Sequence, residues 1–207
     1  SILRLVLGSG QSSASGAAEL PSNRDVMSLS YGPDMCLVLP EAVRQAMLDH
    51  CRRSLAAFRE GRSAECKAFG LICGTVADQV VTAAECLPLH KNVRSQSPHK
   101  ERMDKVMAEY AIPSETPLTM RGWVADPAEL FARIRECRER GETLLGTYHM
   151  HRLGWPHDPL RDTPTRLDEV LARESGLLMF IISMVEPDRP IIRVFFEGNK
   201  EQELLVR

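Results

Sequence analysis

The sequence predicts an α/β domain in which helices flank a curved, mostly antiparallel central sheet. Short apolar segments, typical of buried strands, alternate along the 207 residues with longer segments whose apolar residues recur at helical spacing. Two strand-like segments near the middle of the chain are separated by a short polar turn, which favours antiparallel neighbours. Mixed helices and strands in this order are typical of a layered domain built on one sheet.

The N-terminal residues differ in composition from the rest of the chain. Apolar residues dominate 2–7, and a Gly/Ser-rich run follows at 8–16, a composition that is typical of flexible linkers. We therefore expect 1–25 to form an N-terminal segment and a linker, and 26–207 to form one domain.

The domain is expected to begin with a hairpin and a helix. Segments 28–31 and 35–39 flank a Gly-Pro-Asp turn at 32–34, which predicts two short paired strands. A helix is expected over 41–60, because its apolar residues recur at helical spacing and Gly61 can end it.

The remaining elements follow from the same two periodicities. Antiparallel strands are expected at 68–74 and 79–87. Further along the chain, helices are expected at 100–110, 127–140 and 163–175, and strands at 144–151, 177–184 and 191–197.

Composition and charge exclude several classes of partner. A hydrophobic content of 43% is enough for one well-buried domain. The formal net charge of -2 provides no basic surface for nucleic acid, and no apolar run approaches the ~20 residues that span a bilayer. Because the N-terminus also lacks a secretory pattern, we expect a cytoplasmic protein without nucleic-acid or membrane partners. The sequence carries no signal of its oligomeric state.

The six cysteines are scattered, without a C-x-x-C pair, and most of them lie in apolar segments. They are Cys36, Cys51, Cys66, Cys73, Cys86 and Cys137. We expect free thiols in a reducing compartment, which act as small buried hydrophobic side chains.

Two histidines and one aspartate form the candidate metal site. His149 and His151 lie two residues apart on an expected strand, so both imidazoles point to the same side of the sheet. Asp168 follows in the first turn of the next expected helix. Two imidazole nitrogens and one carboxylate make a common three-ligand zinc shell that leaves a fourth position for water. The pattern therefore predicts a catalytic Zn²⁺ site.

The residues around these ligands resemble the JAMM (JAB1/MPN/Mov34) zinc metalloproteases, in particular their prokaryotic deubiquitinase-like branch. Residues 144–151 and 163–168 are similar to the family's H-x-H-P and P-S-x-x-D signatures. Upstream, 70–74 resembles the family's glycine-flanked apolar strand and 126–130 resembles the start of its central helix. The resemblance implies an MPN/JAB domain with cytidine-deaminase-like layering of helices on a curved sheet.

The sequence departs from the family pattern within the signature. Met150 and Arg152 stand where the family usually has serine and proline, but neither position supplies a ligand. The loop after the second histidine is longer than usual, so counting from the first histidine would select Asp162. The Thr-Pro pair at 163–164 is typical of a helix start, and this favours Asp168 as the third ligand.

The position of the general base is the most consequential departure. By the resemblance, a glutamate three residues before Gly70 should take a proton from the zinc-bound water, but Lys67 stands there. Glu65 is the nearest carboxylate and lies on the same face of an extended strand. Three alternatives stay open: Glu65 is the base, another glutamate such as Glu60 or Glu85 takes this role, or the chain lacks a base.

Thr165 and the long loop at 152–162 each allow two interpretations. Thr165 occupies the place of the family's catalytic serine, so its hydroxyl can stabilise a developing oxyanion, cap the helix, or do both. The loop is either a surface excursion or lines the substrate groove with Leu153, Trp155 and Leu160.

The resemblance implies a zinc-dependent peptidase or isopeptidase that cleaves at the C-terminal tail of a ubiquitin or ubiquitin-like protein. Two alternatives are a catalytically inactive scaffold that binds a ubiquitin-like partner, and a metal hydrolase that acts on a sulfur-carrier precursor or a small-molecule amide. Residues 3–8 fit an ordinary edge strand, or an extended segment similar to the leucine-arginine tail of ubiquitin-like proteins.

Overall fold

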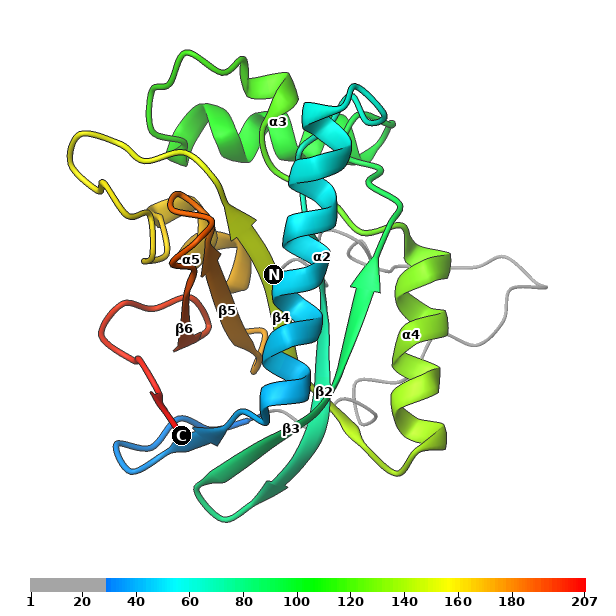
Figure 1. The fold of residues 1–207 in the computed structure, drawn as a ribbon, viewed down its shortest axis with the longest axis vertical. Coiled ribbons are helices and arrows are strands. Elements are labelled where there is room, and N and C mark those ends of the chain that lie inside the picture. The colour runs from blue at the N-terminus through cyan, green and yellow to red at the C-terminus, as the bar shows by residue number, and fades with distance from the viewer. Residues whose placement is uncertain (1–28) are drawn as a thin grey trace.

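One mixed sheet of seven strands organises the protein. The computed structural model describes residues 29–207, with strand order β6-β5-β4-β2-β3-β1-β7 (Figure 1). The N-terminal segment and linker expected over 1–25 lie outside the described residues, as does the strand or tail-like segment considered for 3–8. The strands are β1 (Cys36–Val38), β2 (Phe69–Ala77), β3 (Val80–Leu89), β4 (Thr143–His151), β5 (Leu178–Ser183), β6 (Ile191–Phe196) and β7 (Leu205–Val206).

The sheet is mixed, with three antiparallel and three parallel strand pairs, so the expectation of a mostly antiparallel sheet is met in part. β2 pairs in antiparallel fashion with β3 and β4, and β5 does so with β6. By contrast, β4–β5, β1–β3 and β1–β7 are parallel pairs. The strands β4 and β5 are joined through the helix at Arg166–Ala172, so they can enter the sheet from the same end.

The two edges of the sheet come close to one another. The Phe196 amide donates to the Gln202 carbonyl at 2.8 Å, and the Leu204 amide donates to the Val194 carbonyl at 2.9 Å. Residues 202–204 thus bond to the β6 edge, directly before β7 pairs with β1. The sheet is consequently strongly curved and nearly closed, like a barrel.

The hairpin expected at 28–39 is not present. The turn itself forms, since the Met35 amide donates to the Gly32 carbonyl at 3.0 Å. Residues 29–31, the described part of the segment before the turn, form no strand, and the Leu29 amide instead donates to the Gly176 carbonyl. β1 therefore pairs with β3 and β7, and β7 has no counterpart among the expected strands.

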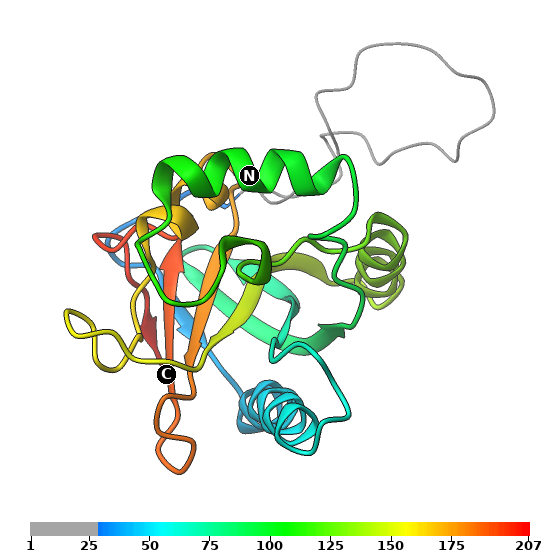
Figure 2. The same cartoon turned by 90° about the horizontal axis from the view of Figure 1, so that it is seen from above.

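The helices lie on both faces of the sheet. They are α2 (Glu41–Arg59), α3 (His99–Tyr110), α4 (Pro127–Glu139) and α5 (Arg166–Ala172), with a 3-10 turn at Leu118–Met120. α2 crosses one face, and Figure 2 shows α3 on the opposite side of the molecule, with α4 beside the sheet. The expected helices at 41–60, 100–110 and 127–140 are confirmed. The helix expected at 163–175 forms, but it is shorter and spans Arg166–Ala172.

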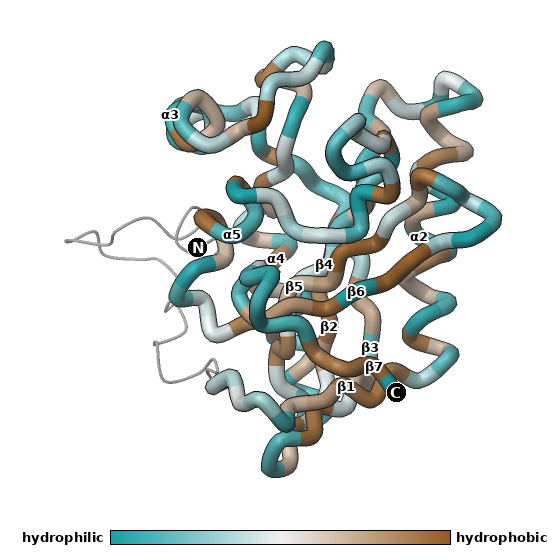
Figure 3. Tube along the Cα trace, turned by 90° about the vertical axis from the view of Figure 1, so that its left-hand side faces the viewer, coloured by the Kyte–Doolittle hydropathy of each residue, from teal (hydrophilic) through white to brown (hydrophobic). Residues whose placement is uncertain are grey.

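Two large apolar cores follow from this layering, and a third, smaller cluster contains Ala172, Met179, Ile181 and Phe195. One core joins α2 to one face of the sheet and contains Met47, Ile72 and Phe180. The other joins α3 and α4 to the opposite face and contains Met103 and Ile134. In Figure 3 the strands are coloured largely as hydrophobic segments, whereas many of the outer turns are hydrophilic.

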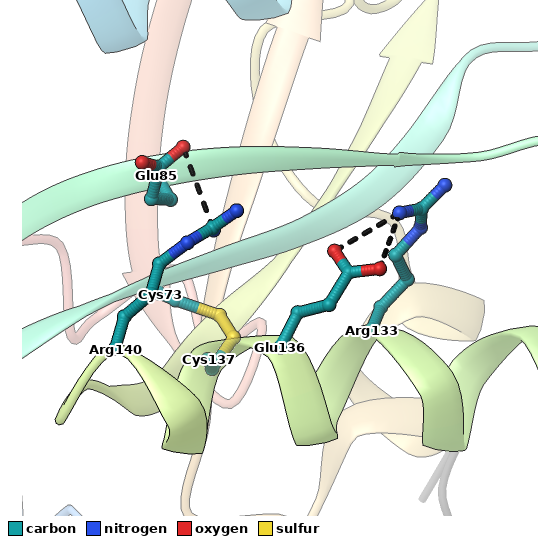
Figure 4. Close-up of a disulfide and its surroundings, with 6 residues drawn as sticks. All are labelled: Cys73, Glu85, Arg133, Glu136, Cys137 and Arg140. Carbon is teal, nitrogen blue, oxygen red and sulfur yellow. Dashed lines mark hydrogen bonds and ion pairs between the residues drawn. A yellow bond between two sulfur atoms is a disulfide. The ribbon is translucent and has the colours of Figure 1, made fainter.

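Two of the six cysteines are bonded to each other, which corrects the expectation that all are free thiols. Cys73 on β2 and Cys137 on α4 form a disulfide with their Cα atoms 6.0 Å apart (Figure 4). This separation is typical of disulfides and results from the packing of α4 on β2. The thiols of Cys36, Cys51, Cys66 and Cys86 are free.

No helix among residues 29–207 has the length and apolarity that crossing a membrane requires.

We predict that Gly146→Ala destabilises the fold. A Cβ at Gly146 would collide with the backbone carbonyl of Leu178 on the neighbouring strand β5, so the strands would have to separate. Overpacking of this kind typically costs ~1–3 kcal/mol in the free energy of unfolding, measurable by urea denaturation. Gly32→Ala is the matched control, because there the added Cβ meets only the flexible end of the Gln79 side chain. Equal losses in both variants would contradict the prediction.

Candidate metal site and its cavity

Strand β4 presents both histidines from the middle of the sheet. It lies between β2, where His149 pairs with Phe69, and β5, where His149 pairs with Ile181. The alternation of a strand points His149 and His151 to the same face, as the sequence predicts. Their exposed fractions are 6% and 7%, so both imidazoles are buried.

The third residue comes from the first turn of α5. Thr165, rather than Thr163, is the N-cap of this helix, and its hydroxyl accepts the Asp168 amide at 3.2 Å. In return, Asp168 Oδ2 accepts from the Thr165 amide at 2.7 Å and from its hydroxyl at 2.8 Å. This reciprocal capping box fixes the carboxylate. Oδ1 then faces the imidazole of His149.

The three side chains converge as ligands of one ion would. His149 Nε2 lies 3.1 Å from His151 Nε2 and 3.3 Å from Asp168 Oδ1, and His151 Nε2 lies 3.8 Å from Asp168 Oδ2. Ligands held ~2.0 Å from a tetrahedral zinc ion are separated by ~3.3 Å. Among the described residues this is the single group of three or more His, Cys, Asp or Glu side chains close enough to hold a metal ion.

The hydrogen bonds of the histidines are compatible with this role. His151 Nδ1 lies 2.7 Å from the Arg161 carbonyl, to which it can only donate, so the lone pair of a neutral ring is on Nε2 and faces the other ligands. Arg161 presents this carbonyl from a left-handed backbone conformation, with φ of 47°. The buried His149 Nδ1 has no protein hydrogen-bond partner among the described residues.

The local electrostatics keep His151 and Asp168 in their metal-binding protonation states. Burial, together with the neighbouring His149, lowers the pKa of His151 to about 3, against the opposing effect of Asp168. Burial alone would raise the pKa of Asp168, but the two adjacent histidines outweigh it and hold that pKa well below its usual value. Neutral imidazole and ionised carboxylate are the forms that bind zinc.

The site opens into a cavity of about 290 Å³. His149, His151, Asp168, Thr165 and Glu65 all line this cavity, so the structure brings every predicted site residue together.

The three candidate glutamates are separated by their positions. Glu65 lines the cavity, whereas Glu60 and Glu85 do not. Glu60 forms an ion pair with Arg62 at the end of α2. Glu85 Oε2 lies 3.8 Å from Arg140 Nη1, beside the disulfide (Figure 4). Of the three, Glu65 is the one that shares the cavity with the three ligands.

Comparisons with known proteins support the fold alone. No protein-family profile matches the chain, and no curated protein is significantly similar to it in sequence. The chain resembles the solution structure of a protein from Desulfitobacterium hafniense with a TM-score of 0.55 and 21% identity, over 83% of this chain and 91% of that one. A solution structure from Salinibacter ruber gives a TM-score of 0.45 and 19% identity, over 82% and 90% of the two chains.

Lys67 lies in the segment directly before β2, at the position that continuation of the strand register brings opposite the histidines. The antiparallel pairing of Phe69 with His149 continues with the Met150 amide donating to the Ala68 carbonyl, which brings residue 67 level with His151. Lys67 Nζ lies 3.5 Å from Glu65 Oε1. Burial lowers the pKa of Lys67, although Glu65 opposes this effect.

The long loop contributes in part to the cavity wall. Leu153 and Trp155 line the cavity, whereas Leu160 does not. Asp162, which simple counting would select as a ligand, instead lies 3.3 Å from Arg193.

Sequence reasoning missed three residues of the site. Arg161 orients His151 through its carbonyl, Asn92 Nδ2 donates to Glu65 Oε2 at 3.0 Å, and Trp123 forms part of the cavity wall. Trp123 also stacks on Phe69, with ring centroids 4.6 Å apart. No local motif marks these residues, because each reaches the site from a loop through long-range packing.

The opposite face of β4 is anchored by a buried polar pair. The Tyr148 hydroxyl and His50 Nδ1, on α2, are 2.7 Å apart. Burial lowers the pKa of His50 from 6.5 to about 4, with smaller effects from His90 and Arg53. The neutral His50 thus links α2 to the strand that carries the ligands.

We predict that His50 makes the fold sensitive to acid. Between pH 6.5 and about 4 the unfolded chain binds a proton at His50 that the folded chain does not, so stability is lost as the pH falls through this window. From pH 7 to pH 5 the loss is about 2 kcal/mol, since one pKa unit corresponds to about 1.4 kcal/mol. Urea denaturation should show a smaller dependence on pH for His50→Gln. The control, exposed His157→Gln, should behave as the wild type; an unchanged slope in His50→Gln would refute this assignment.

Proposed function

We propose that the protein is a zinc-dependent peptidase or isopeptidase of the JAMM type, which cleaves at the C-terminal tail of a ubiquitin or ubiquitin-like protein. The observation that carries the proposal is the convergence of His149, His151 and Asp168 at ligand spacing, in a cavity that also contains Glu65. A three-ligand site that opens into a cavity is typical of catalytic rather than structural zinc.

Each group of the site would have a separate role in the reaction. Zinc, when bound, would supply Lewis-acid activation of water and of the scissile carbonyl. A carboxylate oxygen of Glu65 would accept the proton of the attacking water and return it to the departing amine nitrogen. The Lys67 ammonium and the Asn92 amide hold this carboxylate in place through its two oxygens. Thr165 orients Asp168, and its contribution to an oxyanion stays a prediction.

Two other functions each have one observation in their favour. Lys67 at the register position opposite His151 favours a catalytically inactive scaffold that binds a ubiquitin-like partner, because a lysine there cannot replace the family's glutamate. The limited size of the cavity, about 290 Å³, favours a hydrolase for a sulfur-carrier precursor or a small-molecule amide.

We predict that the chain binds about one zinc ion and that Asp168→Asn weakens this binding by more than ~100-fold, since loss of an outer-shell partner alone typically costs ~10–100-fold. Metal analysis and competition with a chelator would measure both quantities. Asp162→Asn is the matched control, because it removes the same charge from a residue that pairs with Arg193 outside the site. Equal zinc affinity in the two variants would exclude the proposed ligand set.

We predict that Glu65→Gln reduces cleavage of a ubiquitin-like fusion by at least ~10²-fold while zinc content is unchanged, because the amide cannot accept a proton. Glu85→Gln is the control, since Glu85 lies beside Arg140 and not in the cavity. Full activity of Glu65→Gln would exclude Glu65 as the base. A wild type that binds zinc without cleaving, and that gains activity in Lys67→Glu, would establish the inactive alternative.

A further inference from the structure

The cavity has a charge opposite in sign to that of the whole chain. Four cationic side chains line it, against the two carboxylates of Glu65 and Asp168. The cations are Lys67, Arg121, Arg152 and Arg161. The formal net charge of the chain is -2, so this local excess of positive charge is a property of the cavity. A divalent ion bound by the ligands would increase it further.

Several of these cations retain unused hydrogen-bonding capacity. Lys67 has one contact with Glu65, at 3.5 Å, although an ammonium group has three donors. Within residues 29–207, no carboxylate lies at ion-pair distance from Arg121 or Arg161. The Arg161 guanidinium stacks over the Trp155 ring at 3.3 Å from its centroid, and its Nε is buried without a hydrogen-bond partner. The Arg161 guanidinium thus lines the cavity with donors that no carboxylate among the described residues engages, and these are available to an anionic ligand.

The positions of Lys67 and Arg161 relative to the metal ligands are fixed by the backbone. Lys67, in the segment directly before β2, is level with His151, and the Arg161 carbonyl accepts a hydrogen bond from His151 Nδ1. Both cations are therefore held on segments in direct contact with the strand that carries the ligands. An anionic group bound between them would lie close to the amide that the site would cleave.

We propose that the cavity selects amides whose leaving amine carries a carboxylate, such as the C-terminal residue of a peptide, and that Lys67 and Arg161 bind this carboxylate. Lys67 is then a specificity-determining residue and not merely a substitute for a missing base. This inference rests on the proposed function, because it assigns the substrate class of the same site. The volume of about 290 Å³ lies near the lower end of ligand pockets, ~300–1,000 Å³, and suits a short terminal segment.

Binding of two matched probes tests the inference without any need for turnover. N-acetyl-dialanine presents a free carboxylate, and its C-terminal amide differs only in the loss of that charge. The two tryptophans of the chain, Trp123 and Trp155, both line the cavity, so their fluorescence would report binding. We expect the wild-type protein to bind the acid at least ~10-fold more tightly than the amide, as one charge-assisted pair would give.

Variants of the cations identify which residues cause this preference. Lys67→Gln should weaken binding of the acid by ~10-fold and leave binding of the amide unchanged, and Arg161→Gln should act in the same direction. Lys67→Arg conserves the charge and should retain most of the preference. Lys200→Gln, in an exposed turn outside the cavity, is the control and should match the wild type.

Repeating the titrations with zinc-loaded and chelator-treated protein separates this inference from the proposed function. Neither Lys67 nor Arg161 is a ligand, so the preference for the acid should persist without zinc. Equal binding of the two probes, a full preference in Lys67→Gln, or loss of the preference on chelation would overturn the inference even if the protein binds zinc and cleaves amides. A protein that fails to bind zinc but prefers the acid would instead refute the proposed hydrolase and support the anion site.

Discussion

The position of β4 at the centre of the sheet is the constraint on which the rest of the site depends. Its backbone bonds to β2 on one side and to β5 on the other, so the strand cannot shift its register without breaking two ladders. A shift of one residue would turn His149 and His151 to the opposite face, into the core beneath α2. Tyr148 already occupies that face, where its hydroxyl bonds to His50.

The three candidate ligands are polar side chains in a buried position, where the loss of water disfavours their charged forms. Two imidazoles and a carboxylate lie within a few ångströms of one another in the wall of the cavity, with the capping box of α5 and the Arg161 carbonyl as hydrogen-bond partners. Such partners compensate for the loss of water and fix the ring that carries the free nitrogen. The unpartnered Nδ1 of His149 is the exception among the three ligands.

The cavity wall combines a candidate base and a group of cations, and its residues come from three segments that are distant in the sequence. Glu65 and Lys67 come from the segment before β2, Trp123 from the loop before α4, and Arg161 from the long loop after β4. Because these segments meet in one cavity, Lys67, which stands at the expected position of the base, is part of the group of cations that line the cavity. The same lysine also contacts Glu65, so base and anion site would be coupled through one ammonium group.

The sequence by itself determined the two-residue spacing of the histidines, the choice of Asp168 over Asp162, and most helices and strands, because these depend on local periodicity and capping. Only the tertiary structure decided that β1 pairs in parallel with β3, that Cys73 bonds to Cys137, and that Glu65 rather than Glu85 lines the cavity of the ligands. Each of these depends on which segments meet across the sheet. That outcome is set by long-range packing, which neighbouring residues along the chain do not encode.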